Sequence, residues 1–115
     1  MGYDLEEDTW DSTKGNVKGM GANLGEAKGI AKLPNDPTFQ VGDILVANMT
    51  VPENVPVMRK ASAIATNIGS ITCHAAIVAR EMGKPCVVSA KGVTDTAGKL
   101  VTVSVKSIKE AEVRW

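Results

Sequence analysis

Aromatic residues are scarce in this chain of 115 residues and make up 3% of it. They are scattered along the sequence, at Tyr3, Trp10, Phe39 and Trp115. Thirteen basic and thirteen acidic side chains cancel, so no overall field attracts a polyanion such as nucleic acid or an anionic membrane. With neither a basic surplus nor an array of stacking side chains, we do not expect nucleic acid as a partner.

Cysteine and long apolar runs are also rare. Cys73 and Cys86 are the two cysteines of the sequence. The first residues, MGYDLEEDTWDSTKG, are acidic where a signal peptide needs a basic and then an apolar segment. No run of about 18 apolar residues offers a transmembrane helix. We therefore expect a cytoplasmic chain with two free thiols and no membrane partner, because disulfides are rare in a reducing compartment.

What the chain does contain is an ordinary globular composition, 43% hydrophobic, and a length typical of one domain. Its core has to come mainly from Val, Ile, Leu, Ala and Met. The acidic start, followed by Gly, Asn and Ser, predicts a flexible lead-in over residues 1–20, with docking onto a partner as the alternative. The folded domain is then expected over residues 21–115.

Short apolar or alternating runs, bounded by Gly, Pro, Asn and Asp, predict a series of strands. They lie at residues 24–34, 43–49, 62–68, 85–90 and 97–105, with an edge strand at 110–115. A short helix is predicted between the second and third of these, with Thr50 as its cap and Pro52 in its first turn. Strands that alternate with short helices indicate an α/β domain with a mixed, partly parallel sheet.

A second helix is predicted from Cys73 to Met82. Ala75, Val78 and Met82 share one stripe, with Ile77 beside it, and Gly83 is placed to end the helix.

The one histidine of the sequence, His74, lies where a loop becomes this helix. A helix start leaves backbone N–H groups unpaired and carries a partial positive charge, which suits a phosphate. Gly69 and Ser70 let the chain turn tightly, and Thr72 is expected to cap the helix and offer a hydroxyl to an anion. The positive helix end also favours a neutral, nucleophilic imidazole. The residues alone leave a purely structural histidine open as well.

Two other readings of this segment are weaker. Cys73, His74 and Cys86 could be drawn as three metal ligands, but adjacent Cys and His side chains at a helix start diverge. The same divergence argues against Cys73 as a nucleophile with His74 as its base, because the partners of a dyad face each other. Cys86 lies in a predicted strand and is expected in the core.

The segment GSITCHAAIVAREMGKPCVV, residues 69–88, resembles the phosphohistidine signature of the phosphoenolpyruvate-utilising enzymes. That pattern is roughly GG-x-T-(S or C)-H-(A or T)-(A or S)-I-(V or M)-A-R-E-x-G-x-P. The likeness continues upstream through VGDILVANMTVPENVPVMRKASAIATNIG and covers about residues 24–105. TCH in place of TSH is most similar to the phosphoenolpyruvate synthase branch.

The resemblance implies a single compact swivelling β/β/α domain. In it His74 would be transiently phosphorylated, and Gly69, Ser70, Thr72 and Cys73 would support the phosphoryl group. Arg80 matches the arginine of the family's helix, and a plain solvated or salt-bridged role is equally open to it.

By the same resemblance, the histidine shuttles phosphate between a nucleotide site and a phosphoenolpyruvate or pyruvate site on partner domains or subunits. Those domains are expected to hold Mg²⁺ and ATP or phosphoenolpyruvate, and this one to bind no cofactor. Alone, the chain would be part of a phosphotransferase and not a complete enzyme. Ser70 replaces the second glycine of the pattern, Asn67 replaces a frequent aspartate, and the C-terminal pattern differs. A non-catalytic binding or regulatory module that keeps the fold is therefore the alternative.

Overall fold

The structure is a computed structural model that describes residues 15–115. Its strands are β1 (Asn16–Asn23), β2 (Gly25–Lys32), β3 (Ile44–Ala47), β4 (Ala63–Thr66), β5 (Cys86–Val88), β6 (Leu100–Val105) and β7 (Ala111–Arg114). Its helices are α1 (Val55–Lys60) and α2 (His74–Met82), with short 3-10 helices η2 (Pro52–Asn54) and η3 (Val93–Thr96). The mixture of strands and short helices confirms the predicted α/β class.

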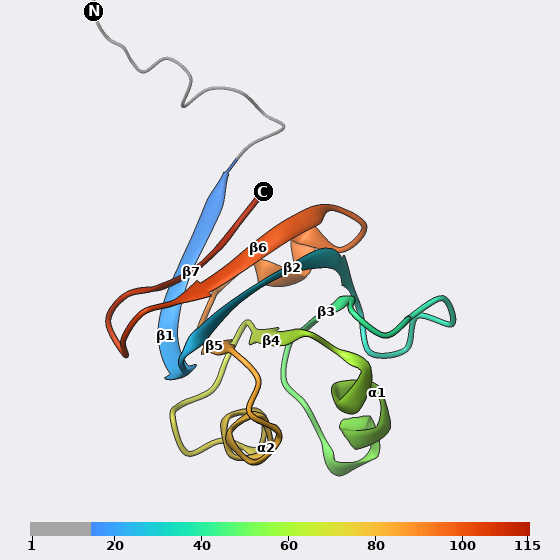
Figure 1. Cartoon of the computed structure of the whole chain (residues 1–115), viewed down its shortest axis with the longest axis horizontal. Helices are drawn as coiled ribbons and strands as arrows, with labels where there is room; N and C mark the ends of the chain where they lie inside the picture. Colours follow the sequence, from blue (N-terminus) through green and yellow to red (C-terminus); the bar gives the residue numbers. More distant parts are fainter. Residues whose placement is uncertain (1–14) are drawn as a thin grey trace, which may run out of the picture.

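The strands close into a barrel in the order β1-β5-β4-β3-β2-β6-β7, and β7 pairs back onto β1 (Figure 1). The pairs from β2 through β3 and β4 to β5 are parallel, whereas all pairs of β1, β6 and β7 are antiparallel. The mixed sheet confirms the sequence prediction, but the closure goes beyond it. The prediction that residues 110–115 form an edge strand is wrong, because β7 is paired on both sides.

Strand β1 begins earlier than the predicted domain boundary at residue 21. Its sequence NVKGMGAN contains two glycines and few large apolar residues, which weakens the strand pattern. Its partners are distant in sequence, since Val17 lies opposite Val113 and Met20 opposite Val88. Residues 16–20 thus belong to the barrel, and Gly15 before them donates its N–H to the Trp115 carbonyl at 3.1 Å. Residues 1–14 of the predicted lead-in lie outside the described residues.

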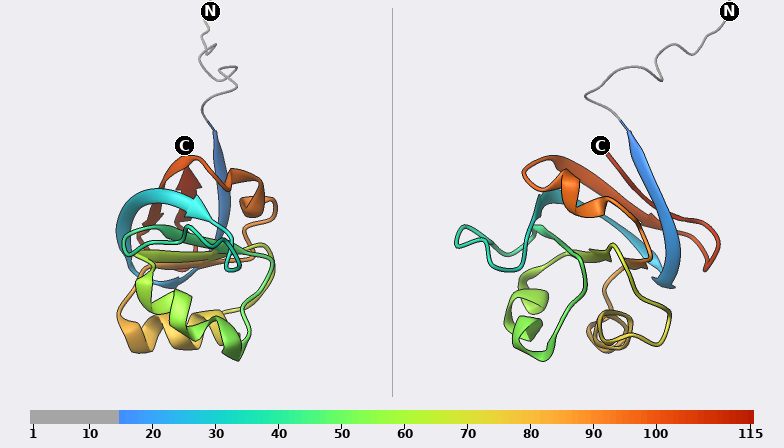
Figure 2. Two further views of the ribbon diagram at one scale, coloured as in Figure 1. Left: turned by 90° about the vertical axis from the view of Figure 1, so that its right-hand side faces the viewer. Right: turned by 180° about the vertical axis from the view of Figure 1, so that it is seen from behind.

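Apolar side chains fill two separate layers. One fills the barrel interior and includes Ile44 and Val46 of β3 together with Val103 of β6. The other lies between the parallel strands and the helices and includes Leu45 and Ile64. Figure 2 shows α1 and α2 side by side beneath the sheet. Because successive residues of β3 and β4 enter opposite layers, these strands are buried on both faces, which explains their unbroken apolar sequences.

Helix α2 lies close to the sheet because its buried face is made of alanines. It ends where predicted, at Gly83, whose φ of 70° is the left-handed conformation of a helix C-cap. Val78 and Met82 are partly buried against the helix layer, but Ile77, expected beside them, is 47% exposed. The fully buried positions are Ala75, Ala76 and Ala79.

The first helical segment starts at Pro52 of η2, and the prediction that Thr50 caps it is wrong. The Oδ1 atom of Asn54 accepts a hydrogen bond from the Val51 N–H at 2.9 Å and stabilises this start. At the other end, the Lys84 ammonium donates to carbonyl oxygens at the end of α1, which ties α1 to the chain that follows α2. These carbonyls belong to Met58, Arg59 and Ala61.

None of the helices in residues 15–115 is long and apolar enough to span a bilayer.

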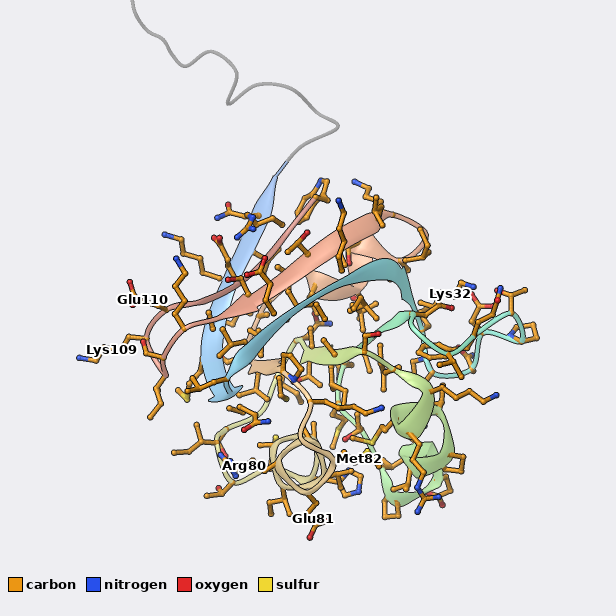
Figure 3. All side chains as sticks on the ribbon, in the orientation of Figure 1. Lys32, Arg80, Glu81, Met82, Lys109 and Glu110 are labelled. Atoms are coloured by element: carbon orange, nitrogen blue, oxygen red, sulfur yellow. The ribbon has the colours of Figure 1, made fainter. Side chains whose placement is uncertain are left out.

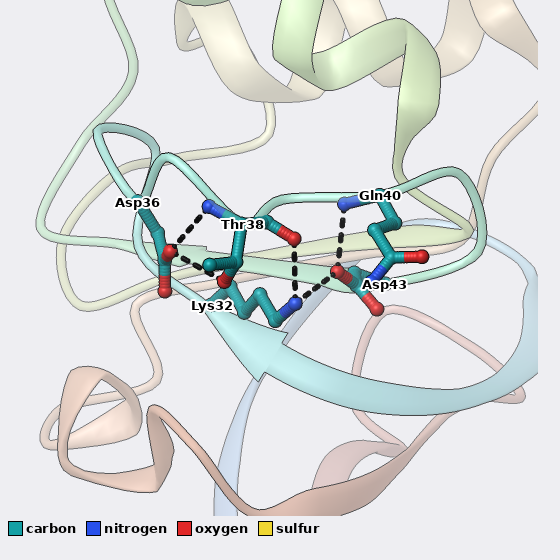
Figure 4. Close-up of polar contacts among 5 residues, drawn as sticks. All are labelled: Lys32, Asp36, Thr38, Gln40 and Asp43. Atoms are coloured by element: carbon teal, nitrogen blue, oxygen red, sulfur yellow. Dashed lines mark hydrogen bonds and ion pairs between the residues drawn. The ribbon is translucent and has the colours of Figure 1, made fainter.

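The loop between β2 and β3 is held by a compact polar network (Figure 4). The Lys32 Nζ lies 2.9 Å from Oδ2 of Asp43 and donates to the Thr38 carbonyl at 2.7 Å. The same carboxylate oxygen accepts from the Gln40 N–H at 2.8 Å. The Thr38 hydroxyl and N–H both donate to Asp36, and these bonds lower the pKa of that carboxyl. The network fixes the entry of the chain into β3.

Candidate functional site

His74 lies where the loop becomes α2, as the sequence predicts, and it is half-buried. It is the first residue of the helix, one position after the predicted start at Cys73. The cap position before it is occupied by Cys73, which is extended (φ −74°, ψ 168°) and makes no side-chain cap hydrogen bond. The helix ladder starts with the Ile77 N–H donating to the Cys73 carbonyl at 3.0 Å. The N–H groups of the first turn therefore have no partner within the helix, and they give this end its partial positive charge.

The prediction that Thr72 caps the helix is wrong. Cys73 occupies the cap position, and the Thr72 hydroxyl pairs with Ser70 in the turn before the helix. Oγ1 of Thr72 lies 3.0 Å from Oγ of Ser70, and Ser70 Oγ also accepts from the Thr72 N–H at 3.3 Å. The Ser70 carbonyl accepts from the Cys73 N–H at 3.1 Å and closes the turn. Ser70 and Thr72 are both exposed, so this turn presents two hydroxyls beside the start of α2.

Gly69 makes the tight entry to that turn possible. Its φ of 136° is a conformation that side chains with a Cβ rarely adopt. A Cβ at this position would also lie 3.0 Å from the Sγ of Cys73. The glycine that the sequence singles out is thus required both by the backbone angle and by the thiol that packs against it.

Thr50 is the residue of this site that the sequence analysis misses. Its Oγ1 lies 2.8 Å from Nδ1 of His74, and the residue is 4% exposed. Thr50 follows β3 while His74 follows β4, and the carboxyl ends of neighbouring parallel strands share one edge of the sheet. Because Thr50 is a polar residue just past the end of β3, this shared edge is the signal that could have placed Thr50 near His74. With Nδ1 engaged, Nε2 is the ring nitrogen left for chemistry.

Arg80 braces the loop that carries His74. Its Nε donates to the Ala22 carbonyl at 3.0 Å, and Nη2 donates to the Ile71 carbonyl. Figure 3 shows Arg80 extending from α2 toward the segment that precedes the helix. The guanidinium therefore joins β1 to the turn between Gly69 and Cys73, a role more specific than that of a solvated helix residue.

Asn67 connects this loop to the one that follows β5. Its Oδ1 accepts from the N–H groups of Gly92 and Thr94 at 3.1 and 3.4 Å. Its Nδ2 donates to Oγ1 of Thr94 at 3.1 Å and to Oδ1 of Asn48 at 3.3 Å. An amide can donate and accept in this way, whereas an ionised aspartate could only accept. Asn67 thus links the loops after β3, β4 and β5.

The two cysteines differ sharply in environment. Cys86 is fully buried, and burial raises the pKa of its thiol to about 12. Its Sγ lies 4.0 Å from the carbonyl oxygen of Ala75, which it faces from the sheet. Cys73 is half-buried beside His74. Within residues 15–115, no three metal-ligating side chains come together to hold an ion, so the metal reading of Cys73, His74 and Cys86 gains no support.

A pocket of about 120 Å³ opens beside the imidazole. It brings His74, Gly69 and Cys73 together, whereas Ser70 and Thr72 are not among its lining residues. Apart from His74, its walls contain no ionisable group other than the Cys73 thiol. The full lining consists of Met49, Thr50, Thr66, Ile68, Gly69, Cys73, His74 and Ala75.

The chain matches a known family over more than half of its length. The family described as "PEP-utilising enzyme, mobile domain" matches residues 39–107, which include every site residue described above, from Thr50 to Arg80.

Curated relatives support this match. The chain is 43% identical over 109 residues to the probable phosphoenolpyruvate synthase of Methanothermobacter thermautotrophicus, covering 91% of this chain and 16% of that protein. It is 44% identical over 93 residues to the phosphoenolpyruvate synthase of Escherichia coli K12, covering 79% and 12%. The chain thus spans less than a fifth of the length of these relatives.

A solved structure shares the fold at low identity. Aconitase X of Thermococcus kodakaraensis aligns with a TM-score of 0.56 and 20% identity, over 86% of this chain and 96% of that one. This likeness concerns architecture alone. The family match and the identities to the two synthases together show that the chain belongs to the mobile domains of the phosphoenolpyruvate-utilising enzymes.

Proposed function

We propose that this chain is a phosphoryl carrier in which Nε2 of His74 is transiently phosphorylated. The bond between His74 Nδ1 and Thr50 Oγ1 is the observation that carries the proposal. When Nδ1–H donates to that buried hydroxyl, the lone pair of the neutral ring lies on Nε2. The same bond fixes the orientation of the imidazole, which a nucleophile in a transfer reaction needs.

In the transfer step, the Nε2 lone pair attacks the phosphorus of the donor. The N–P bond forms as the P–O bond of the donor breaks, and the electron pair of that bond leaves with the donor oxygen. The proton on Nδ1 stays within its hydrogen bond to Thr50. Return transfer reverses these changes on an acceptor oxygen, so the chain needs no further acid or base of its own at this step.

The start of α2 supplies the stabilisation that the charged phosphoryl oxygens require. Backbone N–H groups of the first helical turn and the partial charge of the helix end favour an anion at this place. The hydroxyls of Ser70 and Thr72 and the Cys73 position lie beside it along the same turn. Phosphoryl transfer depends mainly on such positioning and charge stabilisation.

The donor and acceptor sites belong, in this proposal, to other domains or subunits. The relatives named phosphoenolpyruvate synthase are more than five times as long as the matched part. A nucleotide site and a phosphoenolpyruvate or pyruvate site, with Mg²⁺, would lie in that additional length. This chain alone is then a carrier and not a complete enzyme.

Two of the three departures from the family pattern, those at Ser70 and Asn67, do not favour a non-catalytic binding module over a carrier. Ser70 replaces a glycine but takes part in the turn through two hydrogen bonds to Thr72. Asn67 replaces an aspartate but uses both amide atoms to hold neighbouring loops. Neither change removes a group that the carrier needs.

Labelling of His74 tests the proposal. The chain is incubated with ³²P-phosphoenolpyruvate, or with β-labelled ATP, and the complete synthase of Escherichia coli. We expect a label on this chain that is labile in acid and stable in alkali. His74→Ala should fold as the wild type does by circular dichroism and take up no label, while Lys109→Ala, in the β6–β7 hairpin (Figure 3), should be labelled normally.

Two results would contradict the carrier. A label that persists in His74→Ala would place the phosphoryl group elsewhere. No label from either donor, with the wild-type chain folded, would favour the binding module.

A further inference from the structure

A second hollow lies on the outer face of the antiparallel strands, where β6 turns into β7, and we call it the hairpin groove. Its volume is about 210 Å³, and it shares no residue with the pocket beside His74. The lining contains three lysines and two glutamates, so it suits a charged ligand and not an apolar one. Beside one alanine, the lining residues are Lys18, Ser104, Lys106, Lys109, Glu110 and Glu112.

Ser104 is the buried polar residue of the hairpin groove. Its neighbours Val103 and Val105 enter the barrel interior, so the alternation of a strand directs the Ser104 side chain to the outer face. The residue is nevertheless only 5% exposed, and no donor or acceptor of residues 15–115 pairs with its hydroxyl. Buried hydroxyls are normally paired. The Ser104 hydroxyl is therefore a donor that a ligand in the groove can use.

Lys18 reaches the groove from β1. It lies opposite Glu112 of β7, which in turn lies opposite Ser104 of β6. Because residues paired in this way point to the same face of a sheet, the three form one row on the outer face. The Glu112 carboxylate is already held by the Asn16 amide at 3.0 Å and by the Arg114 guanidinium at 2.7 Å. Arg114 offsets the charge of that carboxylate, which leaves the Lys18 ammonium available to an anion.

Lys106 supplies a second ammonium group, and the hairpin tip forms the rim. Lys106 is exposed two residues after Ser104, a spacing that places both side chains on one face of an extended chain. Neither Lys106 nor Lys18 forms an ion pair within the described part of the chain. Figure 3 shows Lys109 and Glu110 extending away from the barrel, where their opposite charges offset each other. The groove itself thus offers two ammonium groups and one buried hydroxyl.

We propose that the hairpin groove binds inorganic phosphate, which accepts hydrogen bonds from the Ser104 hydroxyl and from the ammonium groups of Lys18 and Lys106. A phosphate group carries a charge of about −1.5 to −2 near neutral pH and several strong acceptor oxygens, which match these donors. Glu26, opposite Ser104 on β2, does not line the groove. The lining from the described residues has no large apolar or aromatic side chain to hold an organic moiety, which favours the free ion over a phosphate ester. This site goes beyond the proposed function, because it shares no residue with the His74 pocket.

An NMR titration of the ¹⁵N-labelled chain with inorganic phosphate tests the site. The pH is fixed above the second pKa of phosphate, about 6, and chloride holds the ionic strength constant. Amide signals of Lys18, Ser104 and Lys106 report on the groove, whereas those of residues 70–76 report separately on the start of α2. A second titration with glycerol 3-phosphate distinguishes the free ion from a phosphate ester.

Three variants make the test specific. Ser104→Ala keeps every charge and removes only the buried hydroxyl, and Lys106→Gln removes one ammonium group of the groove. Lys109→Gln is the matched control, because it removes the same charge from the same hairpin at a side chain that extends away from the barrel (Figure 3). A wild-type pattern of signals before phosphate is added shows that each variant folds.

We expect the groove signals of the wild type to follow one saturable curve with phosphate and not to move with chloride alone. Ser104→Ala and Lys106→Gln should each raise the dissociation constant about ten-fold, the effect of one hydrogen bond to a charged group. Lys109→Gln should change it by less than about two-fold, because a charge at the exposed rim is screened.

Three results would overturn the site. Shifts that do not saturate, or that chloride reproduces, would show screening of surface charge only. An unchanged dissociation constant in Ser104→Ala would remove the hydroxyl as a ligand, and equal weakening by Lys106→Gln and Lys109→Gln would reduce the groove to a general attraction of the hairpin for anions. Tighter binding of glycerol 3-phosphate than of phosphate would overturn the free ion as the ligand in favour of an ester.

Discussion

The two halves of the barrel are built on different plans. From β2 through β5 the strands are parallel, short after β2, and covered by α1 and α2 on their outer face. From β1 through β7 and β6 to β2 they are antiparallel, and exposed residues such as Lys28, Leu100 and Arg114 occupy their outer face. Figure 1 shows both helices on the side of the parallel strands.

The difference explains where the chemistry lies. Antiparallel neighbours can be joined by tight hairpins, whereas parallel neighbours need crossover connections that return over one face. The segments that leave the carboxyl ends of β3, β4 and β5 therefore meet at one edge. Thr50, Asn67 and His74 are on the first two of these segments, and Thr94 follows the third. The antiparallel half serves mainly to close the barrel beneath this edge.

The largest expected effect compares the outer faces of the two halves. Ile64 of β4 is fully buried beneath the helices, so Ile64→Ala should lower the free energy of unfolding by about 2–5 kcal/mol. Leu100→Ala, on the open face of β6, should cost well under about 1 kcal/mol, because half of this side chain is already in water. Urea denaturation of both variants measures the difference. Equal losses would show that the helices do not form a second core layer.

Arg80→Met should loosen the loop of the parallel half without altering the barrel. It removes the hydrogen bonds to the carbonyls of Ala22 and Ile71, and because the side chain is exposed we expect a loss of about 1 kcal/mol. Amide hydrogen exchange should accelerate in residues 69–76 and remain slow in β6.

The control for Arg80→Met is Arg59→Met, on α1, where the guanidinium makes no hydrogen bond to the described residues. If both variants leave exchange in residues 69–76 unchanged, Arg80 does not brace the loop.

Thr50→Val tests whether the link between two parallel-strand segments matters to His74. The change keeps the shape but removes the hydroxyl that pairs with Nδ1. The labelling rate should fall about ten-fold, equivalent to about 1.4 kcal/mol and in the range of one hydrogen bond. Thr50→Ser keeps the hydroxyl and should retain most of the rate. Labelling of Thr50→Val at the wild-type rate would separate Thr50 from the chemistry.

The smallest effect is expected on the open face of the antiparallel half. Hydrogen bonds from Arg114 and Asn16 lower the pKa of Glu112 below its usual 4.5. The stabilisation from this carboxylate is complete above that value and is lost as the pH falls through the lower, folded-state pKa. Thermal melts between pH 2 and 6 should show a slightly weaker acid dependence for Glu112→Gln, and 0.5 M salt should reduce the difference. A larger acid dependence in the variant would contradict this assignment.

Local sequence patterns predict the strands and helix end of the parallel half better than those of the antiparallel half. The apolar runs at 43–49, 62–68 and 85–90 predict β3, β4 and β5, and Gly83 ends α2 as expected. These features depend on neighbouring residues and on burial of both strand faces.

The failures to predict β1, the contact of Thr50 with His74 and the closure of the barrel share one cause, which is distance along the chain. Strand β1 is stabilised by partners near residues 88 and 113, and its own sequence lacks a strong pattern. The contact of Thr50 with His74 joins residues 24 positions apart, so the local pattern around Thr50 predicts only a helix cap. Closure of the barrel likewise depends on pairings that no short segment encodes.

The most direct test of the account is to find which ring nitrogen of His74 carries the phosphoryl group. Because the sequence has a single histidine, a chain labelled with ¹⁵N-histidine and phosphorylated by the synthase gives one set of ring signals. The account predicts ³¹P coupling to Nε2, with Nδ1 retaining its bond to Thr50. Coupling to Nδ1, or no phosphohistidine signal in a folded chain, would contradict it.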